Sequence, residues 1–257
     1  MTSVVDTPTV FARETPALSV VLFDLDDTLF AHRAAVTTAI GSYRAALGDS
    51  YAREDEHAAA RRWHQLEEKH YHRYLTGELS YAEQRRERAR GFAEEYGLLL
   101  EDHEADAWFD AYFREYVKAW MLHGDALGCL NTLAAAGVRL GIITNGDLAF
   151  QTSKIERLGL EPLFEHVITS GELGYAKPDA RIFDEACRRF GVEPSQAAYV
   201  GDRLRTDAIG AAGAGLIGVW LDRHGSATIT EIMAARVSGV PIIRTLEELS
   251  AAIGVRA

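Results

Sequence analysis

The chain has 257 residues, of which 47% are hydrophobic and 25% charged, an ordinary composition for a globular protein with a substantial core. Its formal net charge of −11 argues against a broad electrostatic grip on a nucleic acid polymer or on an anionic membrane. A small anionic ligand is compatible with this charge, because a lysine and a metal ion at one site outweigh the global field.

The ends and the cysteines of the chain predict its compartment. Residues 1–16 are polar and irregular, and we expect them to form a disordered leader without the apolar run of a signal peptide. No stretch of the sequence is apolar over the length that a membrane span requires. Cys129 and Cys187 fall in predicted helices, so we do not expect a disulfide framework. These features predict a cytoplasmic protein.

The first predicted strand covers residues 19–23, a continuous apolar run that suits a strand buried on both faces of a parallel sheet. Similar runs recur at residues 138–144, 166–170, 197–201 and 216–221, and a short edge strand is predicted at 241–243. Helical patterns that end at glycines, at Gly137, Gly159 and Gly191, separate several of these runs, and Asp125 is placed to cap the first helix. Strands that alternate with helices predict an α/β fold, a doubly wound Rossmann-like parallel sheet.

Residues 34–120 interrupt that alternation and read as helices throughout. Within them, Ser80 and Glu83 have the spacing of a capping box. Aromatic residues recur from Trp108 to Trp120 at mostly helical spacing, and we interpret them as packing inside the insert rather than as a base-stacking platform. We therefore expect an α/β core domain (17–33 and 121–257) and an all-helical cap domain (34–120) inserted after the first strand.

Polar side chains gather after several predicted strands, where ligands of open α/β sheets bind. The segments are Asp24-Leu25-Asp26-Asp27-Thr28, Thr144-Asn145-Gly146, Lys177-Pro178, and Gly201-Asp202 with Asp207 five residues later. Converging carboxylates repel one another unless a cation lies among them, and oxygen ligands suit Mg²⁺. A carboxylate also attacks phosphorus to give an aspartyl phosphate. In Asp24-x-Asp26 the first side chain can point at phosphorus while the second reaches the leaving-group oxygen.

Taken in order, the four segments resemble the four motifs of the haloacid dehalogenase (HAD) superfamily. The resemblance covers roughly residues 17–33 and 121–225, and the helical insert resembles that superfamily's C1-type cap. It implies that Asp24 attacks the phosphoryl group, and that Asp26 protonates the leaving alcohol and then deprotonates the hydrolytic water. The dehalogenase branch lacks an acid at the position of Asp26, so this residue favours the phosphatase branch.

The resemblance also implies the roles of the other motif residues. Thr144 and the backbone amides near Asn145 and Gly146 hold phosphoryl oxygens, and Lys177 balances the charge of the nucleophile and of the transferring group.

A Mg²⁺ cofactor is implied as well, bound by Asp24, by the backbone carbonyl of Asp26 and by Asp202. Asp207 either orients a metal-bound water or steadies the lysine. We interpret Asp27 and Thr28 as residues that close the turn after the strand.

The implied activity is that of a Mg²⁺-dependent phosphomonoesterase acting on a small phosphorylated metabolite of the nucleotide or sugar phosphate class, through an aspartyl phosphate. A phosphoglucomutase-type phosphotransferase shares every core residue and stays open as the alternative. A metal-independent haloacid dehalogenase and a non-catalytic scaffold are less favoured.

Four side chains are weaker candidates for substrate contact, with solvated surface residues as the competing interpretation. His32 and Arg33 lie on the linker into the insert, and Arg85 and Arg88 follow a glycine turn within it. The expected partner is a small phosphorylated metabolite, with no nucleic acid polymer and no membrane, and the expected assembly is a monomer or a small homo-oligomer.

Overall fold

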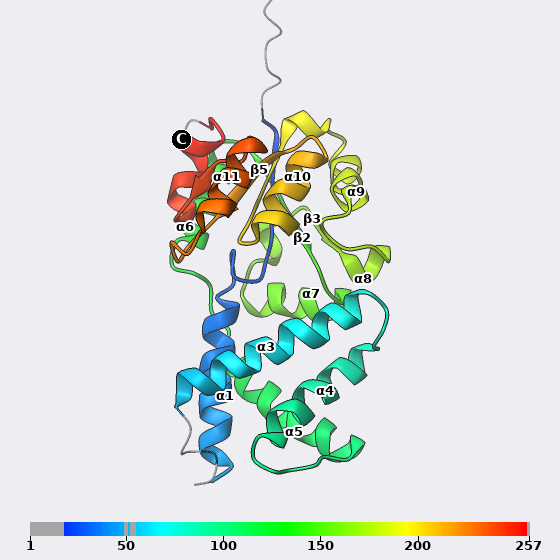
Figure 1. Cartoon of the computed structure of the whole chain (residues 1–257). Helices are drawn as coiled ribbons and strands as arrows, with labels where there is room; N and C mark the ends of the chain where they lie inside the picture. Colours follow the sequence, from blue (N-terminus) through cyan, green and yellow to red (C-terminus); the bar gives the residue numbers. More distant parts are fainter. Residues whose placement is uncertain (1–17, 49–50, 52–54, 256–257) are drawn as a thin grey trace, which may run out of the picture.

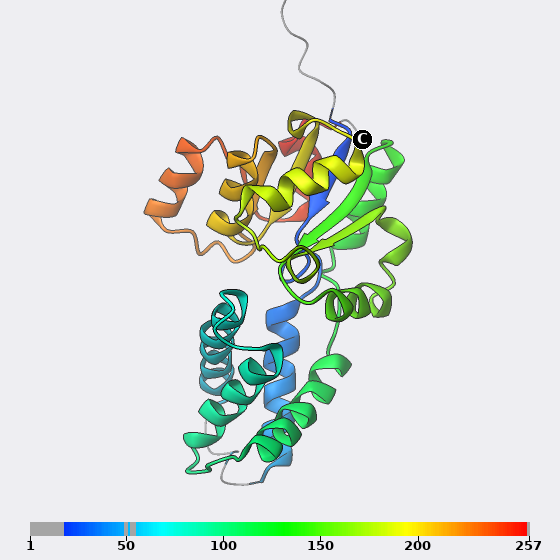
Figure 2. The same cartoon turned by 90° about the vertical axis from the view of Figure 1, so that its right-hand side faces the viewer.

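A computed structural model describes residues 18–48, 51 and 55–255. A parallel sheet with its flanking helices forms one half of the molecule, and four long helices form the other (Figure 1). The view turned by 90° shows the two halves meeting end to end, with the chain crossing near the start of the first helix and after the last helix of the insert (Figure 2). In the described part of the chain, none of the helices combines the length and the apolar character needed to cross a membrane.

The sheet has six strands in the order β3-β2-β1-β4-β5-β6, and all neighbours are parallel. The strands are β1 (Val20–Phe23), β2 (Arg139–Thr144), β3 (His166–Thr169), β4 (Ala197–Gly201), β5 (Ile217–Leu221) and β6 (Ile242–Ile243). Each predicted strand is confirmed. Phe23 pairs with Ile142 and Val200, so the carboxyl ends of β1, β2 and β4 reach the same edge.

Side chains of β1 alternate between two apolar layers, because successive residues of a strand point to opposite faces. Val21 and Phe23 join the larger cluster, which also contains Leu130 of α6. Val20 and Leu22 belong to the cluster on the other face, with residues of α9. All four are fully buried, and each contributes roughly 1.5–3 kcal/mol through the apolar surface it removes from water. Because both faces of β1 are buried, its sequence is a continuous apolar run.

The helices of the sheet half are α6 (Ala126–Ala135), α7 (Leu148–Arg157), α8 (Ser170–Leu173), α9 (Ala180–Phe190), α10 (Gly210–Gly213), α11 (Ile229–Val237) and α12 (Leu249–Ala252). Short segments are η1 (Glu161–Leu163), η2 (Pro194–Gln196), the π-helical η3 (Leu204–Ile209) and η4 (Leu246–Glu248). Asp125 precedes α6 as predicted, but the expected capping bond is absent from the described structure. Its carboxylate instead binds Arg223 at 2.8 Å and the amide of Leu246 at 2.8 Å. Cys129 and Cys187 are free and buried.

The insert consists of α1 (His32–Ala46), α3 (Glu56–Leu75), α4 (Tyr81–Glu94) and α5 (Asp102–Lys118). The predicted capping box is confirmed, since the Glu83 amide donates to Ser80 Oγ and the Ser80 amide to the Glu83 carboxylate. Trp63 of α3 packs against Trp108 and Tyr112 of α5, with ring centroids 5.3 and 4.4 Å apart. Part of the aromatic series therefore forms the interior of the insert, as expected. We keep the division into a core domain and a cap domain as a proposal.

Candidate active site

Three acidic side chains meet at the sheet edge where β1 and β4 end. Asp24 follows β1, and its amide donates to Val200 O of β4 at 2.9 Å. Asp202 follows β4 directly, and Asp207 lies on η3. One oxygen from each of these three carboxylates lies within 4.8 Å of the others. The convergence expected from the parallel strands is therefore present.

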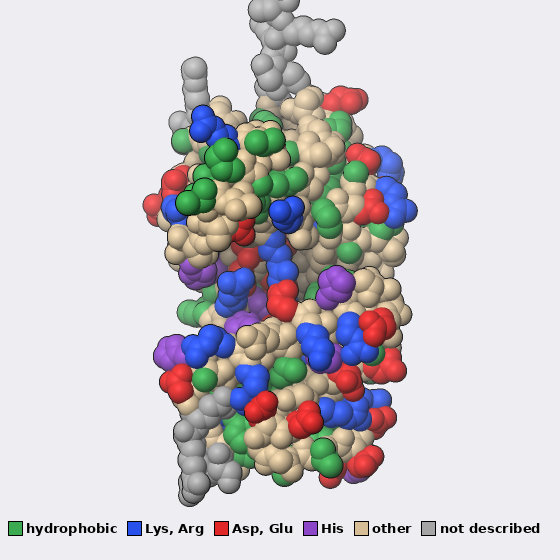
Figure 3. Space-filling view, in the orientation of Figure 1, with side chains coloured by type: hydrophobic (Ala, Val, Ile, Leu, Met, Phe, Trp, Pro, Cys, Tyr) green, Lys and Arg blue, Asp and Glu red, His purple; other side chains and the backbone are tan. Residues whose placement is uncertain are grey.

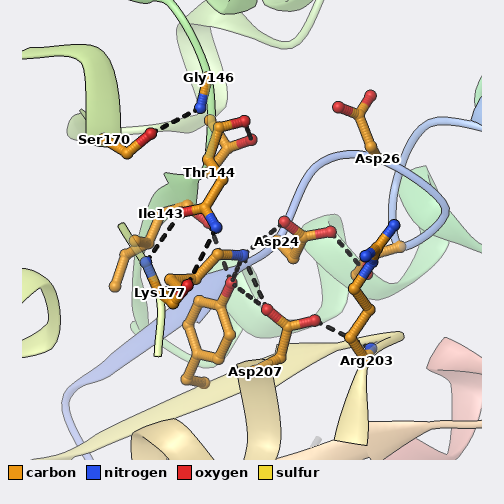
Figure 4. Close-up of polar contacts among 12 residues, drawn as sticks. Asp24, Asp26, Ile143, Thr144, Gly146, Ser170, Lys177, Arg203 and Asp207 are labelled. Atoms are coloured by element: carbon orange, nitrogen blue, oxygen red, sulfur yellow. Dashed lines mark hydrogen bonds and ion pairs between the residues drawn. The ribbon is translucent and has the colours of Figure 1, made fainter. Parts of the chain in front are cut away.

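Lys177 lies among these acids and is itself buried. Its ammonium donates to Asp24 Oδ1 at 2.7 Å, to Asp207 Oδ1 at 2.7 Å and to the Tyr199 hydroxyl at 2.6 Å (Figure 4). These three bonds use all the donors of the ammonium. Tyr199 in turn donates to Ile143 O at 2.9 Å. The lysine is thereby fixed beside the predicted nucleophile.

Asp207 has both carboxylate oxygens engaged. Oδ1 accepts from Lys177, and Oδ2 accepts from the Arg203 amide at 2.9 Å. Of its two predicted roles, this geometry matches the one in which Asp207 steadies the lysine. Tyr199 is a residue that the sequence analysis missed. Its presence in a buried strand was a usable clue, since a buried tyrosine hydroxyl needs a hydrogen-bond partner.

The charges in this cluster are unbalanced, because three carboxylates face one ammonium. Burial raises the pKa of Asp24 to about 7, against the attraction of Lys177 and with added repulsion from Asp207. Burial and then the charges of Asp207 and Asp24 also raise the pKa of Asp202 well above its usual value. Among the described residues, none donates a hydrogen bond to the Asp202 carboxylate or pairs with it.

This donor set fits a divalent cation. Two carboxylates, those of Asp24 and Asp202, are under-compensated, and hard oxygen ligands are what Mg²⁺ prefers. A cation there would also restore the charged form of Asp24, which burial disfavours. Asp24 and Asp202, together with the Asp26 carbonyl, are therefore the residues that would hold it.

Asp26 lies apart from this cluster in the close-up (Figure 4). The ammonium of Lys154 contacts its two oxygens at 2.7 and 3.0 Å, and the Gln151 amide donates to it at 3.2 Å. Burial alone would raise the pKa of Asp26, but the charges of Lys154 and His32 outweigh it and hold that pKa below its usual value. In this arrangement Asp26 is a carboxylate.

Lys154 and Gln151 were also missed from the sequence. Both are almost fully buried on α7, which Asp147 caps just beyond the loop after β2. Their spacing of three residues places them on one face of a helix. A glutamine and a lysine on the same face of the helix that follows a motif loop were the available clue.

The loop after β2 is held by its own contacts. Thr144 Oγ1 accepts from Gln151 at 2.9 Å, and the Gly146 amide donates to Ser170 Oγ at 2.8 Å. The Asn145 side chain clamps the backbone of Lys177, accepting from its amide at 2.9 Å and donating to its carbonyl at 3.2 Å. Asn145 therefore positions the lysine, and phosphate binding by this loop stays a prediction.

Asp27 and Thr28 form the turn after β1, as predicted. Asp27 adopts a φ of 61°, a left-handed conformation that aspartate tolerates, and its carboxylate accepts from the Arg33 amide at 2.8 Å. Thr28 does more than close the turn, because its hydroxyl donates to Asp24 Oδ2 at 3.3 Å.

A cavity of about 470 Å³ lies between the sheet edge and the insert. Space-filling representation shows acidic, basic and histidine side chains along this boundary (Figure 3). Asp24, Lys177 and Asp202 line the cavity from the sheet half, and Arg85 and Arg88 line it from the insert.

His32 and Arg33 were expected on the linker into the insert, but they form the first turn of α1, and they differ in their relation to this cavity. Arg33 is not among the lining residues of the cavity and instead pairs with Asp27 at 3.2 Å. His32 lines the cavity, but both its ring nitrogens are engaged, with the Tyr116 hydroxyl at 2.7 Å and with Glu67 at 3.1 Å. Glu67 also accepts from Arg88 at 2.8 Å, so His32, the first residue of α1, is connected to α3 and α5 directly and to α4 through Glu67.

Comparison with known proteins agrees with this geometry. Residues 18–215 match the model of the haloacid dehalogenase-like hydrolases, and the chain belongs to that family.

Relatives of known activity match over part of their length. Over 117 residues the chain is 41% identical to the glyceraldehyde 3-phosphate phosphatase of Methanopyrus kandleri, covering 46% of this chain and 48% of that protein. Over 100 residues it is 39% identical to the pyrimidine 5′-nucleotidase YjjG of Escherichia coli, covering 38% and 44%. The chain thus spans about half the length, or less, of these two relatives.

A solved structure of the HAD-hydrolase YfnB from Bacillus subtilis, bound to magnesium, superposes with a TM-score of 0.73 at 22% identity. The match covers 92% of this chain and 99% of that one. It supports the fold of both the sheet half and the insert.

Proposed function

We propose that the protein is a Mg²⁺-dependent phosphomonoesterase that hydrolyses a small phosphorylated metabolite of the nucleotide or sugar phosphate class. The observation that carries this proposal is the unbalanced cluster at the sheet edge, where Lys177 is the one cationic side chain of the described residues that forms ion pairs with Asp24, Asp202 or Asp207. The printed activities of relatives such as the glyceraldehyde 3-phosphate phosphatase and the pyrimidine 5′-nucleotidase support the same reaction class.

In the first half-reaction, an oxygen of Asp24 attacks phosphorus in line with the ester oxygen. The new bond from Asp24 to phosphorus forms as the ester bond breaks, and the leaving oxygen takes a proton from Asp26. Lys177 is held 2.7 Å from Asp24 Oδ1 and stabilises the negative charge of the transferring group. A Mg²⁺ ion held by Asp24 and Asp202 would further neutralise the negative charge of the transferring group.

In the second half-reaction, Asp26 takes a proton from a water molecule whose oxygen attacks phosphorus. The bond between Asp24 and phosphorus then breaks, which releases phosphate and regenerates the carboxylate. The pairing of Asp26 with Lys154 gives it the charge state of this base step. For the acid step it must exchange Lys154 for the substrate, and the charge of an incoming phosphate favours the protonated form.

The test is release of phosphate from 4-nitrophenyl phosphate with Mg²⁺ or with excess chelator. We expect activity with Mg²⁺ alone, and we expect Asp24→Asn to lower kcat by roughly 1,000-fold or more while the far-ultraviolet circular dichroism stays unchanged. Full activity in chelator or in Asp24→Asn would contradict the mechanism. Product analysis covers the alternative, because an isomerised sugar phosphate in place of free phosphate would identify a phosphotransferase.

A further inference from the structure

Aromatic side chains line much of the cavity beyond the acidic cluster. Phe109 and Phe113 of α5 and Tyr81 of α4 contribute from the insert, and Phe150 of α7 contributes from the sheet half. The rings of Phe113 and Phe150 have centroids 5.8 Å apart, so this wall continues across the boundary between the two halves. Aromatic faces bind flat π systems by stacking, with little dependence on their exact substitution.

The lysines and arginines that line the cavity already have acidic partners. Each lysine and arginine among the lining residues pairs with a carboxylate: Lys154 with Asp26, Lys177 with Asp24 and Asp207, Arg85 with Asp110, Arg88 with Glu67, and Arg203 with Glu68. A leaving group with its own carboxylate or second phosphate would meet no unpaired lysine or arginine in this lining. Burying an unpaired charge is unfavourable, so the lining favours a neutral leaving group.

Gln84 of α4 adds a polar group to the lining and is only 2% exposed. Its Oε1 is buried and accepts no hydrogen bond from the part of the chain that the structure describes. A buried acceptor without a donor is costly, and an N–H group of a ligand would relieve that cost. Carbonyl and amide groups next to aromatic walls are the usual means of fixing a heteroaromatic ring.

We propose that the cavity binds a nucleoside as the leaving group, which makes nucleoside monophosphates the substrates. The base stacks on the aromatic wall, and one of its N–H groups donates to Gln84, while the phosphate lies at the acidic cluster. A cavity of about 470 Å³ is within the range of small-ligand sites. This inference rests on the proposed phosphomonoesterase activity and refines it, because carboxylate-bearing and doubly phosphorylated esters become poor substrates.

The first experiment compares kcat/KM for three phosphate esters. Uridine 5′-monophosphate and ribose 5-phosphate share the phosphorylated ribose and differ in the base, whereas phosphoglycolate has a small leaving group that carries a carboxylate in place of the sugar. We expect the nucleotide to exceed ribose 5-phosphate by about 10-fold or more, as stacking of one base provides. Phosphoglycolate should fall below ribose 5-phosphate. Equal values for the nucleotide and ribose 5-phosphate, or a preference for phosphoglycolate, would overturn the inference.

The second experiment replaces Gln84 by methionine, which keeps the length of the side chain and removes the acceptor. We expect Gln84→Met to raise KM for uridine 5′-monophosphate by about 10-fold, the effect of one hydrogen bond to a buried group. The value for 4-nitrophenyl phosphate, an aromatic ester without an N–H donor, should change less than about 2-fold. Gln65→Met, at an exposed position of α3, is the matched control and should change neither.

The outcomes separate the inference from the function on which it rests. No phosphate release from any ester, including 4-nitrophenyl phosphate, would refute the proposed function and the inference together. Release from 4-nitrophenyl phosphate without a preference for nucleotides would refute the inference alone. A Gln84→Met variant that loses activity equally with all esters would show a structural role for Gln84 and would remove it from substrate recognition.

Discussion

The two sides of the cavity manage charge in opposite ways. On the sheet side, the two buried carboxylates of Asp24 and Asp207 and the partly buried one of Asp202 face one lysine, and Asp202 lacks a partner among the described residues. On the insert side, Arg85 and Arg88 are each matched to an acid and packed against aromatic rings. An excess of buried negative charge is stable only when a bound ligand or ion supplies positive charge. The insert side, whose charges are paired and whose rings are apolar, can select a ligand by its shape. In the proposed phosphatase, chemistry therefore belongs to the sheet edge and substrate recognition to the insert.

Replacing Asp26 tests the sheet side most strongly. With poor leaving groups such as sugar phosphates, Asp26→Asn should lower kcat by about 100-fold or more, because the leaving oxygen loses its proton donor. The loss should be much smaller with 4-nitrophenyl phosphate, whose leaving group needs no proton. Steady-state kinetics over a series of phenyl phosphates measures the difference. Equal losses across the series would rule out acid catalysis by Asp26.

The stability of the metal-free protein should depend on pH, and Mg²⁺ should reduce that dependence. The pKa of Asp24 rises from 3.8 to about 7 on folding, so the folded state binds more protons than the unfolded state between these values. The free energy of unfolding of the metal-free protein should therefore fall as pH rises through that window, by a few kcal/mol in total, and Asp202 acts in the same direction. Urea unfolding with chelator or with Mg²⁺ measures it, and Mg²⁺ should restore stability at pH 8. If the free energy of unfolding in chelator did not change with pH, the excess of carboxylate charge at this site would be contradicted.

Lys154 and Asp26 form an ion pair in the sheet half, so the charges at this position are paired as they are in the insert. Lys154→Met removes the ammonium that pairs with Asp26, and we expect the free energy of unfolding at pH 7 to fall by about 2 kcal/mol. The exposed lysine of α3 provides the control, because Lys69→Met should change it by less than about 0.5 kcal/mol. Equal effects of the two substitutions would mean that the buried pair contributes no more than a surface charge.

The smallest effect is expected where the two halves touch through solvent-exposed charges. Arg203 of the sheet half pairs with Glu68 of the insert, and both side chains are more than half exposed. Glu68→Gln should lower the free energy of unfolding by less than about 1 kcal/mol, and high salt should remove the difference. A larger, salt-insensitive loss would show that this contact holds the halves together.

The sequence predicted the sheet and the residues at its edge because both depend on local patterns. Apolar runs mark the strands, and parallel strands bring their carboxyl ends together, so the sequence predicted that Asp24 and Asp202 lie close together with Lys177 beside them. The partner of Asp26 was not found, since Lys154 lies 128 residues away and a buried lysine has the same local pattern as a solvated one. Only the packing of α7 distinguishes the two cases.

The aromatic series of α5 shows a second limit of the sequence. Its period predicted packing inside the insert, which Trp108 and Tyr112 confirm. Phe109 and Phe113 belong to the same series but line the cavity. This is because α5 lies between the interior of the insert and the cavity and has apolar residues on both of these faces. Helical spacing carries no information on which of the two spaces a given ring faces.

Tyr71 of α3 donates a hydrogen bond to Asn145 O at 3.1 Å, and the Asn145 side chain clamps the backbone of Lys177. The insert is thus connected, through one asparagine, to the placement of the lysine beside the nucleophile. The position of the insert and the placement of the lysine are therefore linked through a single loop residue. In the proposed enzyme, a displaced insert would lose its hydrogen bond to the loop that holds Lys177.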